Sequence, residues 1–532
     1  MTDQPAPAGE EEVRIPFIPS SRRRAARGWR SRALVLWLGL ATVLPAATSR
    51  AAVNEENDTE SPSKNPPRPY LRVFLGELTF LALQGAWYWG HQEPSESEIA
   101  VGSGSTWGAK LFSDRYFTFD QDKFNTNAVG HPVAGLLYYQ IARGSGLGAG
   151  GSFLAAVAAS TAWKYFGEMN QKISINDLIV TPAAGWVLGE ASYRLGSFFA
   201  DGEPSFANCF GAVVFSPVAT LTESPVCKSR RRDPPFDRLG FSRRTWHQLS
   251  IWLGPAHTVV DGGAPRDETS FGLGARIAAN AYYQRPGRGA STAKPGQWTS
   301  LGAGWLMNNG TIDGVAVHAD SLIVGRYLRD YGDVVGPSGE PDGRGLLVGL
   351  GSSFDYDGRS LPTVYDRTLA LGLGGPVVEL EARRGRFAGR ATFAASYGFA
   401  QVTSLAWAQA APQFADVQVK SELQLQGYYF AQGLLTFASL EAELGDLRLR
   451  FDGRGQSFWS FNSADDHQSQ IQNNFSLHDN QAFLTASGAV QPLRGPVRLT
   501  IQLDDILRSS RLPGTLVRSS EQRIIGSAAL VF

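Results

Sequence analysis

The chain has 532 residues, and 49 Lys and Arg residues balance 49 Asp and Glu residues, so its formal net charge is zero. This balance argues against a nucleic-acid-binding protein, which would carry a basic stripe. Charged residues make up 18% of the chain, aromatic residues 11%, and 59 residues are glycine, a composition that favours an all-β barrel over a cytosolic enzyme. The 43% of hydrophobic residues excludes a wholly disordered chain. The mean hydropathy of −0.16 disfavours a polytopic helical membrane protein.

The first 52 residues read as a signal peptide with an N-terminal extension. A run of arginines between residues 22 and 32 precedes an apolar stretch at 33–44 and a small-residue site at 49–51. This order is typical of a secretory signal. The apolar stretch is shorter than the roughly 20 residues that span a bilayer, and an N-terminal membrane anchor is the alternative. Residues 53–69 are polar and proline-rich and predict a flexible linker.

Residues 70–200 change character and predict a helical segment. The apolar stretch 71–89 predicts an interfacial or buried helix, and 108–119 predicts a short strand. Pro132 begins a helix that reaches residue 143, and Ser152 caps an alanine-rich helix that reaches about residue 168. Ser174 and Asp177 match a capping box, and Thr181-Pro182 predicts the start of a last helix that ends near residue 199.

Residues 201–244 are expected to be a linker that contains the only two cysteines, Cys209 and Cys227. In an oxidising compartment these two cysteines would form a disulfide. Closure of the loop between them would contribute about 3 kcal/mol to stability. Two free thiols are the alternative. The basic run 228–232 would meet lipid phosphates or be only a solvated linker.

From residue 245 to 532 the hydrophobic pattern has period 2 and predicts a barrel. Alternating segments at 269–284, 390–399 and 447–452 place apolar side chains on one face and polar or small ones on the other. The first is longer than the five or six residues of an average soluble strand, and long alternating strands are typical of transmembrane barrels. Turn signals separate the strands and indicate about twelve of them. The turn signals are Asn308-Asn309-Gly310, Asp342-Gly343, Arg384-Gly385 and Gly445-Asp446.

The last ten residues form an amphipathic segment that ends at Phe532. A terminal strand ending in Phe resembles the assembly signal of bacterial outer-membrane barrels, and the last strand of a soluble sheet is the alternative. We therefore expect a mainly β protein in the outer membrane, with a C-terminal antiparallel transmembrane barrel and an N-terminal helical segment packed in or against it. The expected partners are outer-membrane lipids and the barrel assembly machinery, with no nucleic acid.

Residues 122–196 resemble a bacterial family known as a domain of unknown function, DUF3943. The resemblance covers about 75 residues, in which polar groups recur at fixed places in an apolar region. It implies a layout of signal, helical segment and C-terminal barrel, and it implies no activity. The residues that carry it are Asp122 to Asn127, His131-Pro132, Gly135, Tyr138-Tyr139, Ala142-Arg143, Trp163 to Glu168, Ser174 to Leu178, Thr181-Pro182, Gly185 and Gly189-Glu190.

Polar residues in the helical segment are the candidate site. Charged groups in an apolar setting are costly and usually paired. His131, Glu168, Asp177 and Glu190 are the candidate catalytic residues. Glu168 lies near a predicted helix C-terminus, where the helix dipole disfavours a carboxylate, so it needs a partner. Asp122, Asn127, Arg143 and Arg194 complete a structural polar network, which is the alternative to a catalytic site.

Two classes of function follow. The first is a non-enzymatic envelope or transport barrel whose helical segment acts as a plug. The second is an outer-membrane enzyme that acts on lipid or lipopolysaccharide through His131 and Glu168. A water-accessible cleft at these two residues would favour the enzyme, and a closed, paired network would favour the first class. No cofactor and no metal is expected, and the sequence does not identify a small-molecule or lipid cargo.

Overall fold

The computed structural model describes most of the chain after residue 68. The described residues are 69–90, 108, 110–112, 116–120, 122–168, 171–222, 236–237, 239–243, 245–261, 266–280, 283, 286–335, 341–361, 364–414, 419, 421–461, 475–492 and 496–531. The predicted signal peptide, most of the predicted linker at 53–69, Cys227 and Phe532 lie outside them.

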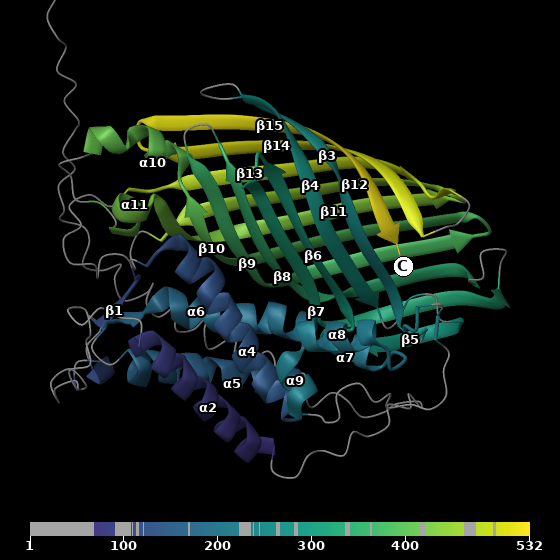
Figure 1. Ribbon diagram of the computed structural model, residues 1–532, viewed down its shortest axis with the longest axis horizontal. Helices are drawn as coiled ribbons and strands as arrows, with labels where there is room; N and C mark the ends of the chain where they lie inside the picture. The colour runs from purple at the N-terminus through teal and green to yellow at the C-terminus, as the bar shows by residue number, and fades with distance from the viewer. Residues whose placement is uncertain are drawn as a thin grey trace, which may run out of the picture. The chain divides into compact units, whose positions relative to one another are not determined.

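The C-terminal part is a closed antiparallel β-barrel (Figure 1). Within the described residues, twelve strands form the ring in the order β7-β6-β4-β3-β15-β14-β13-β12-β11-β10-β9-β8, and β8 pairs with β7 to close it. The short strand β5 pairs with the second half of β7, beyond the part that pairs with β6. The expectation of about twelve barrel strands is confirmed. The strands are β3 Trp246–Asp261, β4 Arg266–Asn280, β5 Gly287–Ala293, β6 Trp298–Asn308, β7 Thr311–Val335, β8 Pro341–Ser360, β9 Tyr365–Arg384, β10 Phe387–Thr403, β11 Tyr428–Leu444, β12 Leu447–Ser460, β13 His478–Val490, β14 Val497–Leu512 and β15 Thr515–Val531.

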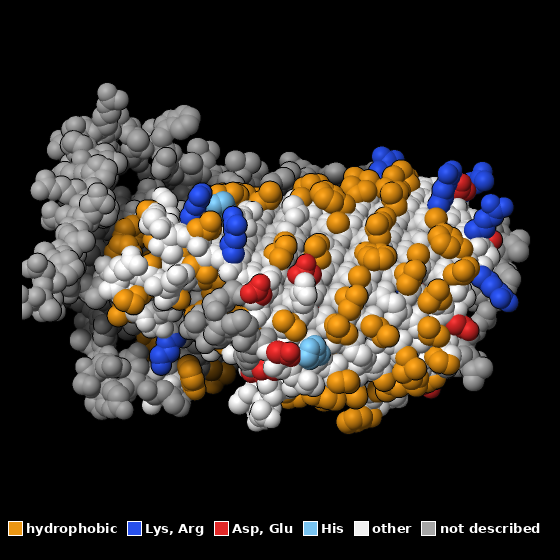
Figure 2. Space-filling model, turned by 90° about the horizontal axis from the view of Figure 1, so that it is seen from above, with side chains coloured by type: hydrophobic (Ala, Val, Ile, Leu, Met, Phe, Trp, Pro, Cys, Tyr) orange, Lys and Arg blue, Asp and Glu red, His pale blue; other side chains and the backbone are white. Residues whose placement is uncertain are grey.

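Side chains alternate between the outer face of the barrel wall and the lumen. On β11, Leu434, Leu440 and Leu444 are exposed on the outside, while Leu435 and Glu441 between them point inward. Such alternation follows from the period-2 geometry of a strand. Figure 2 shows the outward hydrophobic side chains in oblique bands across the barrel, with Lys and Arg nearer the two ends of the view. We call this outer apolar surface of the strands the apolar belt.

Three of the four turn predictions are confirmed by tight hairpins. Asn309 and Gly310 have φ of 49° and 81°, and Gly385 and Gly445 have φ of 61° and 62°, values that favour glycine or asparagine. The prediction at Asp342-Gly343 was wrong, because Gly343 lies inside β8 and pairs with Tyr331. The alternating pattern at 269–284 also extended one strand too far toward the C-terminus, because β4 ends at Asn280.

The N-terminal part is a layer of helices with one small parallel sheet. Residues 201–244 were expected to be a linker, but α8 and α9 lie within this range. Thr181-Pro182 does not start a helix, because α6 continues through Pro182 into η4 and α7. Residues 108–119 contain only the two-residue strand β1. The elements are α2 Pro69–Gly90, β1 Phe117–Thr118, η2 Thr126–Gly130, α4 His131–Gly144, α5 Ala149–Ala162, η3 Trp163–Gly167, β2 Ile173–Ser174, α6 Ile175–Ala184, η4 Gly185–Gly189, α7 Glu190–Ala200, α8 Phe206–Phe215 and α9 Pro217–Thr222.

The helical layer packs against the outer face of the barrel wall rather than inside it. Phe430 lies on the same face of β11 as the exposed Leu434 and Leu440, and it stacks on Phe119 with ring centroids 5.1 Å apart. Phe124 likewise packs edge-on against Tyr428. Figure 1 shows the helices alongside the barrel. The interpretation of residues 70–200 as a lumen plug was therefore wrong, whereas packing against the barrel is correct.

A different segment packs on inward-facing side chains at one end of the barrel. The connection between β10 and β11 contains α10 Leu405–Ala410, η5 Ala411–Phe414 and α11 Ser421–Gln426. Trp407 and Leu423 are buried with Tyr429 and Leu435 of β11, whose side chains point inward. The backbone N–H of Ala406 donates to Ser510 on the inner face of β14 at 3.0 Å. Because α10 and α11 bury inward-facing residues at the end of the barrel, they act as the cap of this lumen (Figure 1).

Cys209 lies on α8 and is disulfide-bonded. The only other cysteine of the chain is Cys227. Cys227 lies outside the described residues, so the pairing of Cys209 with Cys227 stays a prediction.

Among the described helices, none combines the length and the hydropathy needed to cross a membrane.

Candidate functional site

Three helical elements bring ionisable side chains together within the helical layer. His131 begins α4, Lys164 lies on η3, Glu168 follows η3, and Asp177 lies in the first turn of α6. Asp120 follows β1, which pairs with β2 just before α6. We call these five residues the acid–base cluster. Three π-helical turns, η2, η3 and η4, lie next to these positions, and such turns are frequent at functional sites.

Asp177 is the centre of the acid–base cluster. Its side chain is 1% exposed, and its Oδ1 lies 3.0 Å from His131 Nε2, while Lys164 pairs with its other oxygen. Its backbone N–H donates to the Ser174 hydroxyl at 3.3 Å, so the predicted cap is confirmed. Burial alone would raise the pKa of Asp177, but His131 and Lys164 outweigh burial and hold it below its ordinary value. The same carboxylate raises the pKa of His131 in spite of the burial that lowers it.

Glu168 has the partners that its position requires. Lys164 Nζ lies 2.5 Å from its Oε2, and the Trp163 indole N–H donates to its Oε1 at 2.8 Å. The ammonium of Lys110 donates to the backbone carbonyls of Lys164 and Glu168 at 3.1 and 2.6 Å. Glu168 and His131 are therefore connected through Lys164 and Asp177.

Asp120 was missed by the sequence analysis, which singled out its neighbour Asp122. Asp120 accepts hydrogen bonds from Asn127 Nδ2 at 2.7 Å, Ser174 Oγ at 2.7 Å and Asn176 Nδ2 at 3.0 Å. Burial, and then the charge of Asp177, raise the pKa of Asp120 to about 7. The side chain of Asp122 is exposed, and its backbone carbonyl accepts from Tyr428 at 2.6 Å. Asp120 directly follows Thr118 and Phe119 in the sequence, and no periodic pattern there could have identified it.

Glu190 belongs to a separate ion network. Arg143 donates to both of its carboxylate oxygens at 2.8 and 3.0 Å, Arg194 donates at 2.9 Å, and the Tyr139 hydroxyl donates at 2.7 Å. Burial would raise the pKa of Glu190, but Arg143 and Arg194 lower it. The carboxylate is thus matched by two guanidinium groups, an arrangement that fixes α4 against α7.

The chemistry open to the acid–base cluster is limited by its own partners. Donor atoms of Asp120, His131 and Asp177 lie within 4.8 Å of one another, a set that suits a divalent transition metal. However, Lys164 already places a positive charge against Asp177, and three protein groups donate to Asp120. The same residues can pass a proton between His131 and Asp177. Whether the acid–base cluster holds a metal or passes a proton, Glu168 stays paired with Lys164 and hydrogen-bonded to Trp163.

Glu77 of α2 is a buried carboxyl outside both networks. Its side chain is 8% exposed, and neither oxygen has a hydrogen-bond partner within the described part of the chain. Burial raises its pKa to about 9 from 4.5.

Glu77→Gln should therefore make stability less dependent on pH. Between pH 4.5 and 9 the unfolded chain ionises Glu77 while the folded chain keeps it protonated, so folded stability falls as the pH rises, by about 1 kcal/mol per pH unit. The Glu77→Gln variant does not lose stability in this way. In thermal melts in detergent, its melting temperature relative to the unaltered protein should therefore be higher at pH 8 than at pH 5. An equal difference at both pH values would show that Glu77 is ionised in the fold.

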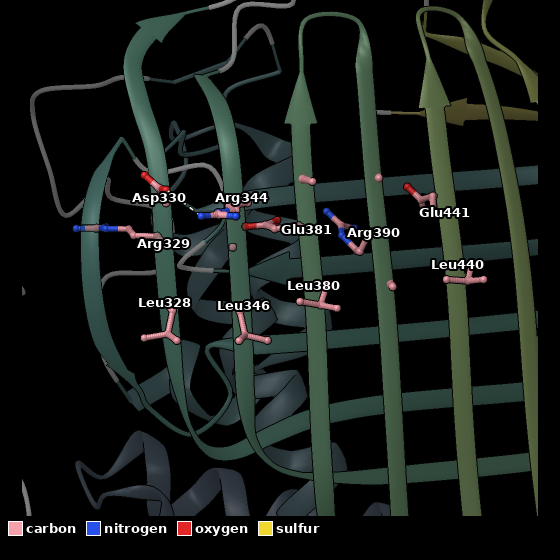
Figure 3. A pocket seen from close by; sticks show the side chains of 14 residues that line it. Leu328, Arg329, Asp330, Arg344, Leu346, Leu380, Glu381, Arg390, Leu440 and Glu441 are labelled. Atoms are coloured by element: carbon pink, nitrogen blue, oxygen red, sulfur yellow. Dashed lines mark ion pairs between the residues drawn. The ribbon is translucent and has the colours of Figure 1, made fainter.

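A groove of about 660 Å³ lies on the barrel wall near one end. Leu328, Leu346, Leu380 and Leu440 form one row across it, and charged residues form a second row beside them (Figure 3). The leucines belong to the apolar belt, whereas Arg344 is 79% exposed and pairs with Asp330 at 3.6 Å. The charged row joins both faces of the wall, because Arg344 is exposed on the outside whereas Arg390 and Glu441 point into the lumen. None of the candidate residues of the helical layer lines this groove.

Comparison with known proteins finds a family match within the helical layer. Residues 116–218 match the family described as "Domain of unknown function (DUF3943)". The resemblance at 122–196 is therefore confirmed, and the match extends through α8 to the start of α9. No curated protein matches this chain.

Solved outer-membrane barrels are similar to the barrel part. A FadL homologue from Pseudomonas aeruginosa has 8% identity and a TM-score of 0.19, covering 55% of this chain and 91% of its own. OpdK from Pseudomonas aeruginosa has 11% identity and a TM-score of 0.15, with coverages of 54% and 99%. The translocator domain of the autotransporter NalP from Neisseria meningitidis has 10% identity and a TM-score of 0.20, with coverages of 53% and 88%. These likenesses are too low to carry an argument about function.

Proposed function

We propose that this protein is a non-enzymatic outer-membrane barrel with a closed lumen, which serves the envelope by holding the helical layer beside its wall. The side-chain pairs that cross the lumen, together with the packing of α10 and α11 on inward-facing residues, carry this proposal. A twelve-stranded ring has room for more than its own inward side chains, so the contacts that cross its interior decide whether it conducts.

Paired side chains cross the interior between distant strands. Arg454 on β12 donates to Asp355 on β8 at 2.7 Å, and Arg508 on β14 lies 3.4 Å from Asp366 on β9. Arg390 on β10 lies over the ring of Trp246 on β3, 4.5 Å from its centroid, although these strands are six steps apart around the ring. Together with α10 and α11 at one mouth, these contacts support a lumen without a continuous water path.

The ionisable side chains of the helical layer are paired with one another, and this supports a structural role over a catalytic one. His131 and Glu168, the pair of the enzyme hypothesis, do not meet, and each is held by an internal partner. Breaking such buried pairs is costly, which suits residues that fix a fold. Transport of a small polar solute is the second candidate, favoured by the charged inner wall. It would require the cross-lumen pairs and the α10–α11 cap to open.

Electrical recording distinguishes these roles. We expect the purified full chain to show heat-modifiable migration in gels. After reconstitution in planar bilayers, we expect it to show no steady conductance. The matched comparison is a variant in which α10 is replaced by a Gly/Ser linker of equal length and Arg454 by Ala, which should conduct. A steady open channel in the unaltered protein would contradict the closed-barrel proposal and favour transport.

A further inference from the structure

The helix α2 buries only a narrow stripe of its surface. Its buried residues are Val73, Glu77 and Gly85, which follow one another at intervals of about one and two helical turns. The stripe faces α4, where Phe80 packs edge-on against Tyr138 with ring centroids 5.4 Å apart and Gln84 accepts a hydrogen bond from the Tyr138 hydroxyl at 2.7 Å. Near its end, Tyr88 packs edge-on against Trp163 of η3 with ring centroids 5.6 Å apart, so the contacts lie along one side of this 22-residue helix.

The uncovered face of α2 is almost entirely apolar. The large apolar side chains that it exposes are Tyr70 77%, Leu71 46%, Phe74 62%, Leu75 51%, Leu78 53%, Leu83 64%, Trp87 65% and Trp89 39%. Arg72 and Thr79 are the polar side chains on this face, and the Thr79 hydroxyl donates to the Leu75 carbonyl at 2.8 Å. A soluble protein rarely leaves so continuous an apolar face in water, because hydration of that surface is unfavourable.

Another helix of the layer has the same character. On α8, Phe206 and Phe210 stack on each other at 6.0 Å and are 86% and 60% exposed, and Val214 is 54% exposed. The apolar exposure is thus a property of the helical layer and not of one helix.

The position of the layer identifies what can cover these faces. The helices pack on outward-facing residues of the wall, such as Phe430 on β11 and Ile277 on β4, on the same side as the apolar belt. On β11 the exposed Leu434 follows Phe430 by two strand repeats on the same face, so the covered patch continues into the apolar belt. Whatever solvent surrounds the apolar belt therefore also surrounds the helices beside it.

We propose that the exposed faces of α2 and α8 lie against lipid acyl chains beside the barrel, so that the helical layer is a membrane-embedded flank of the barrel. This inference rests on the proposed outer-membrane location. The ends of α2 suit such a position. Tyr70 and Arg72 lie near its start and Trp87 and Trp89 near its end, and these residue types favour the boundary between lipid and water.

The buried Glu77 fits the same setting. Its burial without a partner favours the neutral acid, which is the form that an apolar environment stabilises.

Spin labels report directly on the surroundings of these faces. A single cysteine is introduced as Phe74→Cys or Leu78→Cys in the oxidised full chain, whose Cys209 is disulfide-bonded and does not react. The labelled protein is reconstituted in vesicles of phosphatidylethanolamine and phosphatidylglycerol, and the collision rates with oxygen and with a water-soluble nickel chelate are compared. Leu440→Cys on the apolar belt is the lipid reference, and Lys172→Cys, an exposed position of the helical layer, is the water reference.

We expect labels at 74 and 78 to match the label at 440, with a collision rate for oxygen several-fold above that for the nickel chelate. If they match 172 while 440 reports lipid, the flank inference is overturned and the outer-membrane proposal stands. If 440 itself reports water, the outer-membrane proposal fails and the inference fails with it. Labels at 74 and 78 that are shielded from both reagents would show that a protein surface covers α2, which also overturns the inference.

Discussion

Asp177→Ala should reduce the folded yield strongly and lower the free energy of unfolding by about 3–5 kcal/mol. The change leaves His131 and the ammonium of Lys164 without their shared carboxylate in a buried setting, because Asp177 contacts both groups. It leaves the cap of α6 in place, since the Ser174 hydroxyl accepts from the backbone of residue 177. The measurement is the thermal transition and the yield of barrel in detergent.

The pH dependence gives a second readout of the same variant. Because the pKa of Asp177 is held below its ordinary value, its stabilising contribution is complete above about pH 4 and is lost as the pH falls through the folded pKa. The difference between Asp177→Ala and the unaltered protein should therefore shrink in strong acid. Asp267→Ala is the control, since that carboxyl is 73% exposed on β4 and should change stability by under about 0.5 kcal/mol.

Two further variants separate a structural network from a catalytic one. Glu168→Ala and His131→Ala should both reduce stability, because each removes one member of a buried chain of pairs. Normal folding of both variants would contradict the structural interpretation of the acid–base cluster and would favour the enzyme hypothesis.

Gly135→Ala should be strongly disruptive for the addition of a single methyl group, lowering the free energy of unfolding by about 3 kcal/mol or more. A Cβ at Gly135 would lie 1.8 Å from the backbone carbonyl oxygen of Thr181, and a Cβ at Gly185 would lie 2.6 Å from the carbonyl oxygen of Gly135. The obstacle in each case is backbone, so α4 and α6 would have to move apart. The expected result is loss of the compact helical layer, measured by proteolysis of the reconstituted protein.

Gly130→Ala provides the matched control on the same stretch of helix. A Cβ at Gly130 meets nothing within 4 Å, and alanine forms helix better than glycine by about 1 kcal/mol. Gly130→Ala should therefore leave stability unchanged or raise it. If Gly135→Ala were tolerated as well as Gly130→Ala, the close contact between α4 and α6 would not be needed for the fold.

The sequence by itself determined the barrel, the helical layer and several of their local features. Alternation at 390–399 and 447–452 follows from backbone geometry alone, because inward and outward side chains must meet different solvents. The hairpins at Gly310, Gly385 and Gly445 and the cap at Ser174 depend on residues within a few positions of each other. Polar residues in an apolar helical region likewise indicated buried pairs, and Glu190 with Arg194 forms one.

Only the tertiary structure decided which elements meet. Asp120 and Lys164 joined the acid–base cluster through the pairing of β1 with β2 and the packing of α5 and α6, contacts that no local pattern encodes. Pro182 lies inside α6, where packing against α4 outweighs its disfavoured helix propensity. α10 and α11 bury inward-facing residues at one end of the barrel, while the longer helices lie on the outer wall. The physical reason is that an apolar helix face fits the outside of a lipid-facing wall, whereas the charged interior favours paired side chains from the strands themselves.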